Sequence, residues 1–506
     1  MYPSIVVQQV EQGICDFLRT TFSISTPHFH HVMEDFLSEK TLFAGPYISL
    51  ALPFKEGKSG RDRFSSFKMK YHPHVHQDQA FNNLSGPAPV STLVATGTGS
   101  GKTECFLYPI LHHCWLHRHE PGIKAILIYP MNALATDQAE RIAKEIAKAS
   151  ELSGQLTAGL YVGSKEDEPK KKMGENFVIT CKETLRKSPP DILLTNYKML
   201  DYLLTRPQDA PLWANNSPET LKYLVVDELH TFDGAQGTDL ACLIRRLKDR
   251  LGIPENNLCC VGTSATLGDE SAADKLISYA QRIFGEPFGQ KALITESRKT
   301  SGEFLGDALI KNVHSPEPAQ EPWLNHERFK SRESYLLKQY QLWFDKEASE
   351  DDLKDDKWRA ALGEDLKSHL LFQNMVKVLK GRIVSLPELW TDLSGIIKGA
   401  ESAPVRYPEH LLGSLVALVS LALRPAGTND RNKPVYTSLV DVRVQHWLRE
   451  LGRMVVSTGP NPKLAYSDDL TDQESSQHLP VVHCRECGAM GWLGCVKSLK
   501  IRWCPI

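Results

Sequence analysis

The sequence predicts an α/β fold in which helices cover both faces of a parallel sheet, and three observations lead to this prediction. Short apolar segments alternate with amphipathic segments between residues 90 and 265. The apolar segments are continuous runs, which is typical of strands that are buried on both faces. Each polar motif directly follows one of these runs, and parallel sheets bind their ligands at the carboxyl ends of their strands.

Length, composition and charge limit the class of protein. The chain of 506 residues is long enough for about three or four domains. Its net charge of -2 excludes a generally basic surface, so nucleic acid would have to bind in a local groove. The 11 scattered cysteines favour a reduced, cytoplasmic protein. We find no signal peptide, and the longest apolar run, Leu412–Leu423, is shorter than the roughly 20 residues that span a membrane.

The stretch VATGTGSGKTE at residues 94–104 predicts a phosphate-binding loop between a strand and a helix. Its glycines allow successive backbone N–H groups to point inward, and the helix N-terminus adds partial positive charge. Lys102 would reach the β- and γ-phosphates, and the Thr103 hydroxyl would bind Mg²⁺. Thr96 replaces the first Gly of the usual pattern. The predicted nucleotide-binding residues of the loop are Thr96, Gly97, Thr98, Gly99, Ser100, Gly101, Lys102 and Thr103.

Gln77 lies about twenty residues before this loop, in the segment YHPHVHQDQA. A side-chain amide offers one acceptor and two donors, which match the N6 and N7 edge of adenine. We therefore expect Gln77 to bind adenine, with an ordinary helix start as the alternative. The three histidines nearby are a weak metal pattern, because no cysteine or acidic cluster accompanies them.

Strands and helices alternate after the loop. The strand Thr92–Ala95 leads into the loop, and the later strands are expected at Lys124–Tyr129, Thr157–Val162, Asp191–Thr195, Tyr223–Val226 and Leu258–Gly262. Helices are expected at Ala133–Ser150, Tyr197–Leu204 and Gln236–Leu251. Strands that alternate with helices in this way predict one parallel sheet with helices on either side.

Two further polar motifs follow strands of this sheet. Asp227 and Glu228 come directly after Tyr223–Val226, and we expect Asp227 to bind Mg²⁺ and Glu228 to orient or deprotonate water. Ser264 and Thr266 follow the last strand, where their hydroxyls would link the nucleotide site to its neighbour. An ordinary helix cap is the alternative for these two residues.

Together these motifs resemble those of superfamily 2 helicases. The resemblance rests on Gln77, the phosphate loop and the stretches YPMNALATDQ at 129–138, LTNY at 194–197, DELH at 227–230 and SAT at 264–266. It implies a RecA-like first motor lobe that uses ATP and Mg²⁺ to move along nucleic acid. It also implies catalytic roles for Lys102, Asp227, Glu228 and His230, coupling roles for His230, Ser264 and Thr266, and contacts of Pro130, Asn132, Thr195 and Asn196 with a nucleic-acid backbone.

Two stretches narrow the resemblance. The sequence HTFDGAQGT at 230–238, followed by LIRRL at 243–247, looks like that of the MrfA- and Hrq-type DNA helicases. Residues 441–450 and 479–488 are similar to the DruE-like helicases of Druantia anti-phage systems. The resemblance implies single-stranded or branched DNA as the partner and a role in anti-phage defence or DNA repair. An RNA-acting relative is the alternative that Gly234–Thr238 disfavours.

We expect a helical N-terminal accessory region over 1–65, the RecA-like lobe over 66–290, a mostly helical insertion over 291–435, and a helix with a cysteine-rich segment over 436–506. No second set of motor motifs follows Thr266, although a complete motor needs a second lobe with an arginine finger. We therefore expect the N-terminal piece of a longer helicase, completed by a second RecA-like lobe in the same protein or a neighbouring chain. We expect such a piece to bind ATP weakly and to hydrolyse little of it unless a complementing chain is present. The alternative is a catalytically weak nucleotide- or DNA-binding scaffold, or a pseudogene product.

The C-terminal cysteines offer a second metal hypothesis. Cys484 and Cys487 have the two-residue spacing of a zinc knuckle, and Cys495 and Cys504 would complete four ligands for Zn²⁺. The alternative is a redox-silent pair with two buried thiols.

Overall fold

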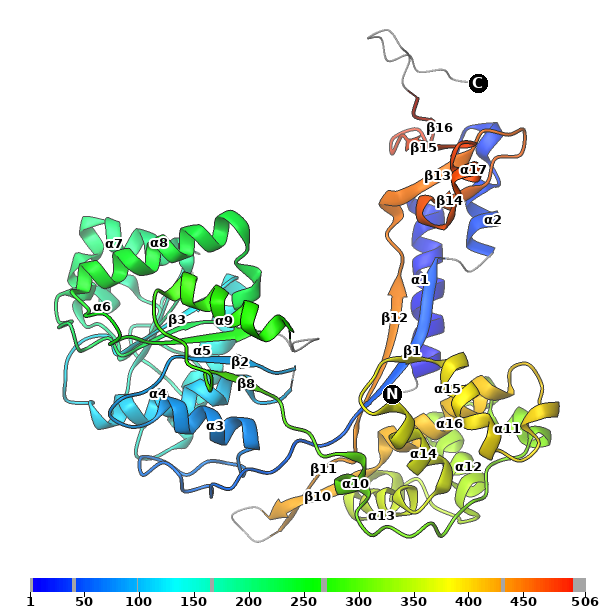
Figure 1. Ribbon diagram of the computed structural model, residues 1–506, viewed down its shortest axis with the longest axis horizontal. Helices are drawn as coiled ribbons and strands as arrows, with labels where there is room; N and C mark the ends of the chain where they lie inside the picture. The colour runs from blue at the N-terminus through cyan, green and yellow to red at the C-terminus, as the bar shows by residue number, and fades with distance from the viewer. Residues whose placement is uncertain are drawn as a thin grey trace. The chain divides into compact units, whose positions relative to one another are not determined.

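The computed structural model describes residues 3–38, 42–97, 99–163, 168–264, 271–428 and 433–494. The chain divides into two compact units (Figure 1). One uninterrupted segment, Phe54–Arg298, forms what we call the sheet unit. Met1–Pro53 and Lys299–Ile506 together form the split unit. The sheet unit therefore begins before residue 66 and ends after residue 290, the bounds expected for the RecA-like lobe.

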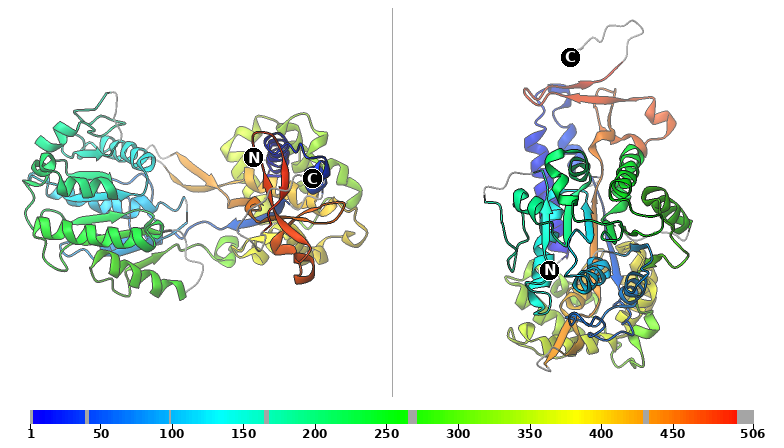
Figure 2. Two further views of the ribbon diagram at one scale, coloured as in Figure 1. Left: turned by 90° about the horizontal axis from the view of Figure 1, so that it is seen from above. Right: turned by 90° about the vertical axis from the view of Figure 1, so that its left-hand side faces the viewer.

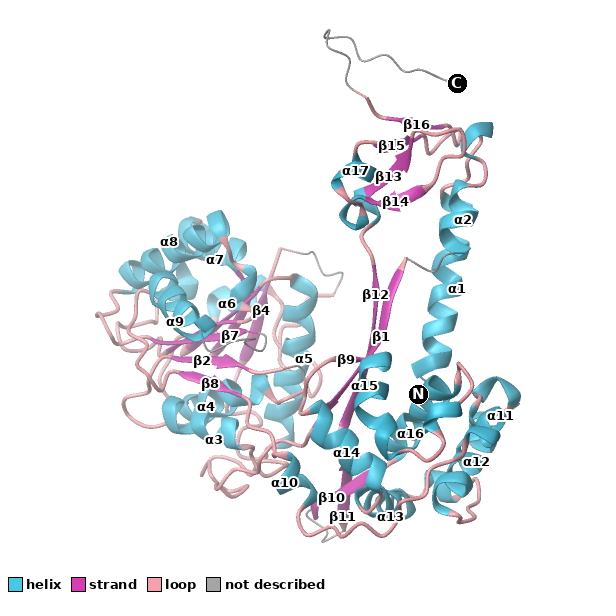
Figure 3. Ribbon diagram, turned by 45° about the vertical axis from the view of Figure 1, so that its right-hand side comes forward, coloured by secondary structure: helices cyan, strands magenta, loops and turns pink. Residues whose placement is uncertain are grey.

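A seven-stranded parallel sheet lies at the centre of the sheet unit (Figure 3). The strand order is β4-β5-β3-β6-β7-β2-β8. Strands β2 to β7 are almost entirely buried, as their continuous apolar runs predict. The predicted α/β fold with a parallel sheet between helices is thereby confirmed. The strands are β2 (Thr92–Ala95), β3 (Ala125–Tyr129), β4 (Ala158–Tyr161), β5 (Ile192–Asn196), β6 (Tyr223–Val226), β7 (Cys259–Ser264) and β8 (Leu293–Thr295).

Helices cover both faces of the sheet (Figures 1 and 2). Successive residues of a strand point to opposite faces, so Ile126 and Ile128 of β3 pack in one core and Ala125 and Leu127 in the other. The first core includes α7 (Tyr197–Thr205), α8 (Gly234–Leu251) and α9 (Ser271–Phe284), and the second includes α3 (Val75–Leu84), α4 (Lys102–Leu116) and α5 (Asn132–Lys148). The short helix α6 (Lys182–Lys187) precedes β5.

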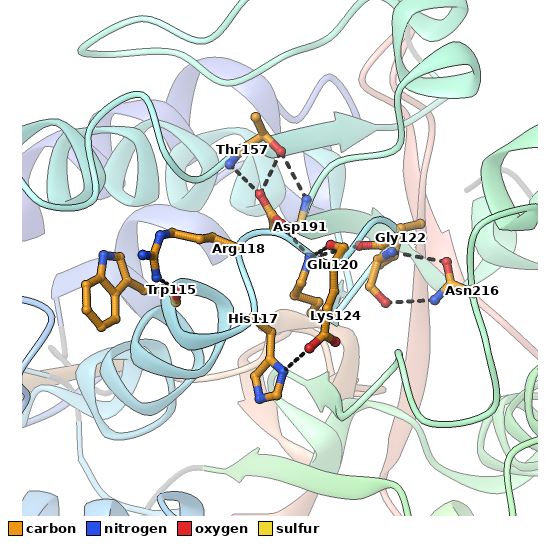
Figure 4. A network of polar contacts seen from close by, with 10 residues as sticks. Trp115, His117, Arg118, Glu120, Gly122, Lys124, Thr157, Asp191 and Asn216 are labelled. Carbon is orange, nitrogen blue, oxygen red and sulfur yellow. Dashed lines mark hydrogen bonds and ion pairs between the residues drawn. The ribbon is translucent and has the colours of Figure 1, made fainter.

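A buried ion pair ties together the amino ends of β3, β4 and β5 (Figure 4). The Lys124 amine donates to Asp191 Oδ1 at 2.7 Å and to the carbonyl oxygen of Glu120 at 2.6 Å. The other carboxylate oxygen of Asp191 accepts from the backbone N–H and the hydroxyl of Thr157, at 2.8 and 2.9 Å. Lys124 is 1% exposed. With these partners both buried charges are paired and hydrogen-bonded. Removal of Lys124 would leave the Asp191 charge buried without a compensating cation.

The split unit has a helical core. Trp343 and Tyr407 are fully buried in it, and the Trp343 indole donates to the Ser414 hydroxyl at 2.8 Å. Among the described residues of the chain, no helix is both long and apolar enough to cross a membrane. The helices of this core are α10 (Ser301–Leu305), α11 (Glu321–Leu324), α12 (Arg332–Phe344), α13 (Asp356–Lys367), α14 (Leu370–Leu379), α15 (Leu386–Leu393) and α16 (Tyr407–Leu421).

The N-terminal region differs from the helical accessory region that we expected over 1–65. Its first part is helical, as α1 (Pro3–Thr21) and α2 (Val32–Ser38). The next element is a strand, β1 (Phe43–Ala51), which pairs antiparallel with β12 (Asp441–Leu448) near the other end of the sequence. Residues 1–53 consequently share a unit with the C-terminal half of the chain. Local periodicity could not predict this, because the partner strand is distant in sequence.

The C-terminal region also differs from expectation, because strands replace the helix expected within 436–506. In β12 the sequence DVRVQHWL alternates with period two, and Val442 and Val444 pack against the helical core. The only α-helix described there is α17 (Asp472–Ser475). The remaining strands of the split unit are β9 (Val384–Ser385), β10 (Leu423–Thr428), β11 (Pro434–Ser438), β13 (Met454–Ser457), β14 (Leu464–Tyr466), β15 (His478–His483) and β16 (Met490–Trp492).

Lys124→Met tests the buried ion pair. Because Asp191 would remain buried without its cation, the free energy of opening of β3 should fall by about 3–5 kcal/mol. Hydrogen exchange of the Ala125–Tyr129 amides measures this quantity. The control is Lys144→Met, which removes the half-exposed ion pair with Glu140 on α5 and should change it by less than about 1 kcal/mol. Equal effects of the two substitutions would contradict the assignment.

Candidate nucleotide-binding site

Three adjacent strands bring the predicted motifs to one edge of the sheet. Strand β7 pairs with β6 on one side and with β2 on the other, all in parallel. The phosphate loop follows β2, and Asp227 and Glu228 follow β6. Since parallel strands end at the same edge, the loop and the acid pair lie one strand apart, with Ser264 at the end of β7 between them.

The phosphate loop has the backbone that its glycines predict. Gly99 and Gly101 have φ angles of 79° and 78°, which L side chains rarely adopt. The buried hydroxyls of Thr96 and Ser100 hydrogen-bond each other at 2.7 Å across the loop. Helix α4 begins at Lys102, so its free N–H groups face the loop. Thr98 lies outside the described residues.

Lys102 connects the phosphate loop with the acid pair. Its amine donates to Glu228 Oε1 at 3.3 Å and to the carbonyl oxygen of Ser264 at 3.2 Å. The Lys102 side chain is 17% exposed, so the amine is held by these contacts yet remains accessible. A cation in this position can bind an anionic phosphate that enters the loop.

The acid pair is held by Thr263, the residue before Ser264. The Thr263 hydroxyl donates to Asp227 Oδ1 and accepts from the backbone N–H of Glu228 at 3.0 Å. Glu228 has a φ of 49°, in the left-handed region that residues other than glycine rarely adopt. Burial raises the pKa of Asp227, and the Thr263 hydrogen bond partly offsets this effect. A part-buried, oxygen-only ligand of this kind suits Mg²⁺.

Arg141 of α5 fixes the first turn of α4. Its guanidinium donates to the Thr103 hydroxyl at 3.3 Å and to the Glu104 carboxylate. The hydroxyl of Thr103 is the group predicted to bind Mg²⁺. Arg141 therefore orients the Thr103 side chain, which we predict to bind Mg²⁺ from the side of the phosphate loop.

The model of the DEAD/DEAH box helicase family matches residues 74–274, which include the loop, the acid pair and β7. The chain contains a DEAD/DEAH box helicase domain. The matched residues fall within the sheet unit.

Individual relatives match up to about half of this chain, and each match covers a smaller share of the relative's own length. The Druantia protein DruE of Escherichia coli (strain UMEA 4076-1) is 30% identical, over 42% of this chain and 17% of that protein. An ATP-dependent helicase of Methanocaldococcus jannaschii is 31% identical, over 50% of this chain and 37% of that protein. A crystal structure of the DUF1998 helicase MrfA bound to DNA is 21% identical with a TM-score of 0.37, covering 52% of this chain and 34% of that one. The chain thus spans less than two-fifths of these curated relatives.

His230 lies beside the acid pair of the helicase domain. Its Nδ1 is 3.3 Å from the Ser264 hydroxyl and 3.5 Å from Glu228 Oε2. His230 thus lies between the end of β7 and the acid pair, and its coupling role stays a prediction. Thr266, the other predicted coupling residue, lies outside the described residues.

Gln77 is next to the loop, but its amide already has partners. Its oxygen accepts from the His74 N–H at 2.9 Å, and its nitrogen donates to the Gly101 carbonyl at 3.2 Å. Gln77 is 9% exposed. To bind adenine through both groups it would have to release these contacts, so its adenine-binding role stays a prediction.

The residues expected to contact nucleic acid differ in exposure. Asn132 is exposed, and its side-chain oxygen accepts from Asn196 at 2.6 Å, which joins the ends of β3 and β5. Pro130 lies in the same turn and is partly exposed. Thr195 is fully buried, and its hydroxyl donates to the carbonyl of Tyr161 at 2.8 Å. Thr195 therefore supports this turn and does not present a group at the surface, contrary to the expected direct contact.

The cysteine pair occupies a hairpin turn in the split unit. Cys484 and Cys487 lie between β15 and β16, and the Gly488 N–H donates to the Cys484 carbonyl at 2.9 Å. Hydrogen bonds from the backbone N–H groups of Cys487 and Glu486 lower the pKa of Cys484. Cys495 and Cys504 lie outside the described residues. Within the described ranges, no group of three metal-binding side chains is found.

Three contributing residues escaped the analysis of the sequence: Thr263 as the support of the acid pair, Arg141 and Glu296. Thr263 stands directly before the recognised Ser264, so a polar residue at a strand end was an available signal. Arg141 reaches the site only through the packing of α5. Glu296 follows β8, which pairs with β2, and its carboxylate accepts from the Gly97 N–H of the loop at 2.8 Å. No local pattern marks either residue.

Asp227→Asn tests the assignment of Asp227 to Mg²⁺. The pKa of Asp227 is raised in the folded state, so at neutral pH the charged carboxylate costs stability that a neutral amide does not. We expect a Tm equal to or above that of the wild type, together with loss of the strengthening of ATP binding by Mg²⁺. Thermal unfolding and nucleotide titration with and without Mg²⁺ measure both. A variant that retains the full Mg²⁺ effect would exclude Asp227 as a metal ligand.

Proposed function

We propose that this chain provides the first motor lobe of an ATP-dependent DNA helicase or translocase. The contact of Lys102 with Glu228 is the observation that carries the proposal, because it joins the phosphate loop to the acid pair across β7. Lys102 and the loop amides bind the triphosphate, and Glu228 orients and deprotonates the attacking water. Thr103 and Asp227 hold Mg²⁺, which neutralises phosphate charge when bound.

DNA is the proposed nucleic acid. The exposed turn with Asn132 and Asn196 offers side-chain amides suited to a phosphate backbone, which gives grip without sequence preference. The stretch Gly234–Thr238 favours DNA over RNA through its resemblance to DNA helicases.

A second RecA-like lobe is proposed as a partner. In the described residues every parallel strand pair belongs to the one seven-stranded sheet, so a second ATP-binding wall and an arginine finger must come from elsewhere in a working motor. An arginine finger is worth roughly 10³-fold or more in rate. We therefore propose that this chain alone binds ATP weakly and turns it over slowly.

The presence of a single parallel sheet in the described residues favours a second candidate function, a nucleotide- or DNA-binding scaffold without ATP turnover. The relation to DruE supports a role in anti-phage defence, and DNA repair is the alternative; in both cases we propose a cytoplasmic location. A working motor would lose its cellular function with Lys102→Ala, whereas a scaffold that needs no ATP would keep it. Protection of cells against phage or DNA damage is the measurement that separates the two.

Lys102→Ala should weaken binding of Mg²⁺–ATP by at least about tenfold, or about 1.4 kcal/mol, because the phosphates lose their cation. Lys222→Ala is the matched control, since Lys222 precedes β6 at the opposite edge of the sheet and contacts Asn257. It should change the affinity less than about twofold. Equal binding by wild type and Lys102→Ala would contradict the proposed site. Rapid turnover by the chain alone with single-stranded DNA would contradict the need for a second lobe.

Zinc is the second proposed metal. Cys484 and Cys487 sit on a hairpin turn with Gly488 in a left-handed conformation, φ 74°, which fits one half of a four-cysteine site. Cys495 and Cys504 would supply the other half. We expect about one equivalent of zinc in the purified protein, reduced by Cys484→Ser. Metal analysis that finds less than about a tenth of an equivalent would exclude such a site.

A further inference from the structure

We propose that Glu296 and Arg298 link the phosphate loop to the two segments through which the chain enters and leaves the sheet unit, residues 54–57 and 296–299, so that nucleotide binding alters these segments. The chain passes between its two units at Pro53–Phe54 and at Arg298–Lys299. The inference rests on the proposed nucleotide-binding function. It adds a structural response outside the site to nucleotide binding. In this proposal Glu296 is a positioning residue, because it acts through Gly97 and Arg298.

Strand pairing places Glu296 beside the loop. Strand β8 runs parallel to β2 with Ala95 opposite Thr295, so the next residue of β8 reaches the start of the loop. There Glu296 Oε2 accepts the backbone N–H of Gly97 at 2.8 Å. Burial alone would raise the pKa of Glu296, but the hydrogen bonds from Arg298 and Gly97 outweigh it and lower the pKa. The loop is therefore held by a charged carboxylate.

Arg298 connects Glu296 with the entering segment, residues 54–57. Its Nε donates to Glu296 Oε1 at 2.7 Å, and its guanidinium lies 3.9 Å from the centroid of the Phe54 ring. Phe54 and Arg298 form an antiparallel bridge, and the Lys55 N–H donates to the Ser297 carbonyl at 2.8 Å. The entering and leaving segments are thus joined to each other at the point where the carboxylate holds the loop.

Phe54 also reaches the other side of the loop. Its ring packs edge-on against His76 with centroids 5.2 Å apart, and His76 Nε2 donates to the Ser100 carbonyl at 2.8 Å. His76 is fully buried, and burial lowers its pKa, so the ring is neutral. The Phe54 ring is therefore connected to the loop by two sets of contacts. One runs through Arg298 and Glu296 to Gly97, and the other runs through His76 to Ser100.

This arrangement makes the loop sensitive to charge. A triphosphate adds negative charge beside the Glu296 carboxylate, and like charges repel in a part-buried setting. Movement of Glu296 changes the position of its ion-pair partner Arg298, and Arg298 lies on Phe54. Residues 54–57 and 296–299 at the unit boundary then respond to nucleotide, as a coupling between two positions requires.

Hydrogen exchange of the full chain, with and without Mg²⁺–ATP, tests this link. In wild type we expect ATP to slow exchange in the loop at 99–103 and to change exchange in 54–57 and 296–299. In Glu296→Ala the loop should remain protected at saturating ATP, while the response of 54–57 falls by at least about fivefold. Glu296→Gln can still accept from Gly97 but loses the ion pair, so its response should fall as well.

Glu286→Gln is the matched control, because it removes another buried carboxylate of the sheet unit, one that pairs with Lys248. It should retain both responses. A full response of 54–57 in Glu296→Ala, or in Glu296→Gln should Glu296→Ala fail to fold, would overturn the link while loop protection upholds the nucleotide site. Absence of loop protection in wild type would overturn the proposed function, and the link with it.

Discussion

The parallel pairing of β6, β7 and β2 is the constraint on which the site depends. The phosphate loop and the acid pair are far apart in sequence, and only this strand order ends them at the same edge, one strand apart. Two residues at the end of the middle strand β7 contact these two motifs. The Thr263 hydroxyl donates to the Asp227 carboxylate, and the Ser264 carbonyl accepts from the Lys102 amine. The sheet thus fixes the spacing between the phosphate loop and the acid pair, and the residues after the strands supply the charged side chains.

Charge at this edge is arranged in opposed groups. Lys102 lies against Glu228, Arg141 against Glu104, and Arg298 against Glu296, each as one cation with one carboxylate. All three pairs include or directly contact a residue of the loop or of the first turn of α4. A highly charged ligand in the loop would therefore lie close to all three ion pairs. The proposed link between nucleotide binding and residues 54–57 depends on this proximity.

The sequence predicted the sheet unit better than the split unit, for physical reasons. Strands buried on both faces, such as Tyr223–Val226, are continuous apolar runs with a polar motif at the end, and both features are local. The pairing of Phe43–Ala51 with Asp441–Leu448 joins distant segments, and no local pattern encodes it. The same holds within the site: Lys102 and Asp227 belong to recognisable motifs, whereas Arg141 and Glu296 arrive by packing and strand pairing. Thr195 is the reverse case: it belongs to a recognisable motif, but the motif does not show that its side chain is buried.

A crystal structure of the chain with Mg²⁺ and a non-hydrolysable ATP analogue tests the central claim most directly. The account predicts that the β- and γ-phosphates lie in the loop within hydrogen-bond reach of the Lys102 amine, with Mg²⁺ between Thr103 and Asp227. An analogue bound elsewhere on the sheet unit, or bound with Lys102 still paired to Glu228 and remote from the phosphates, would contradict it.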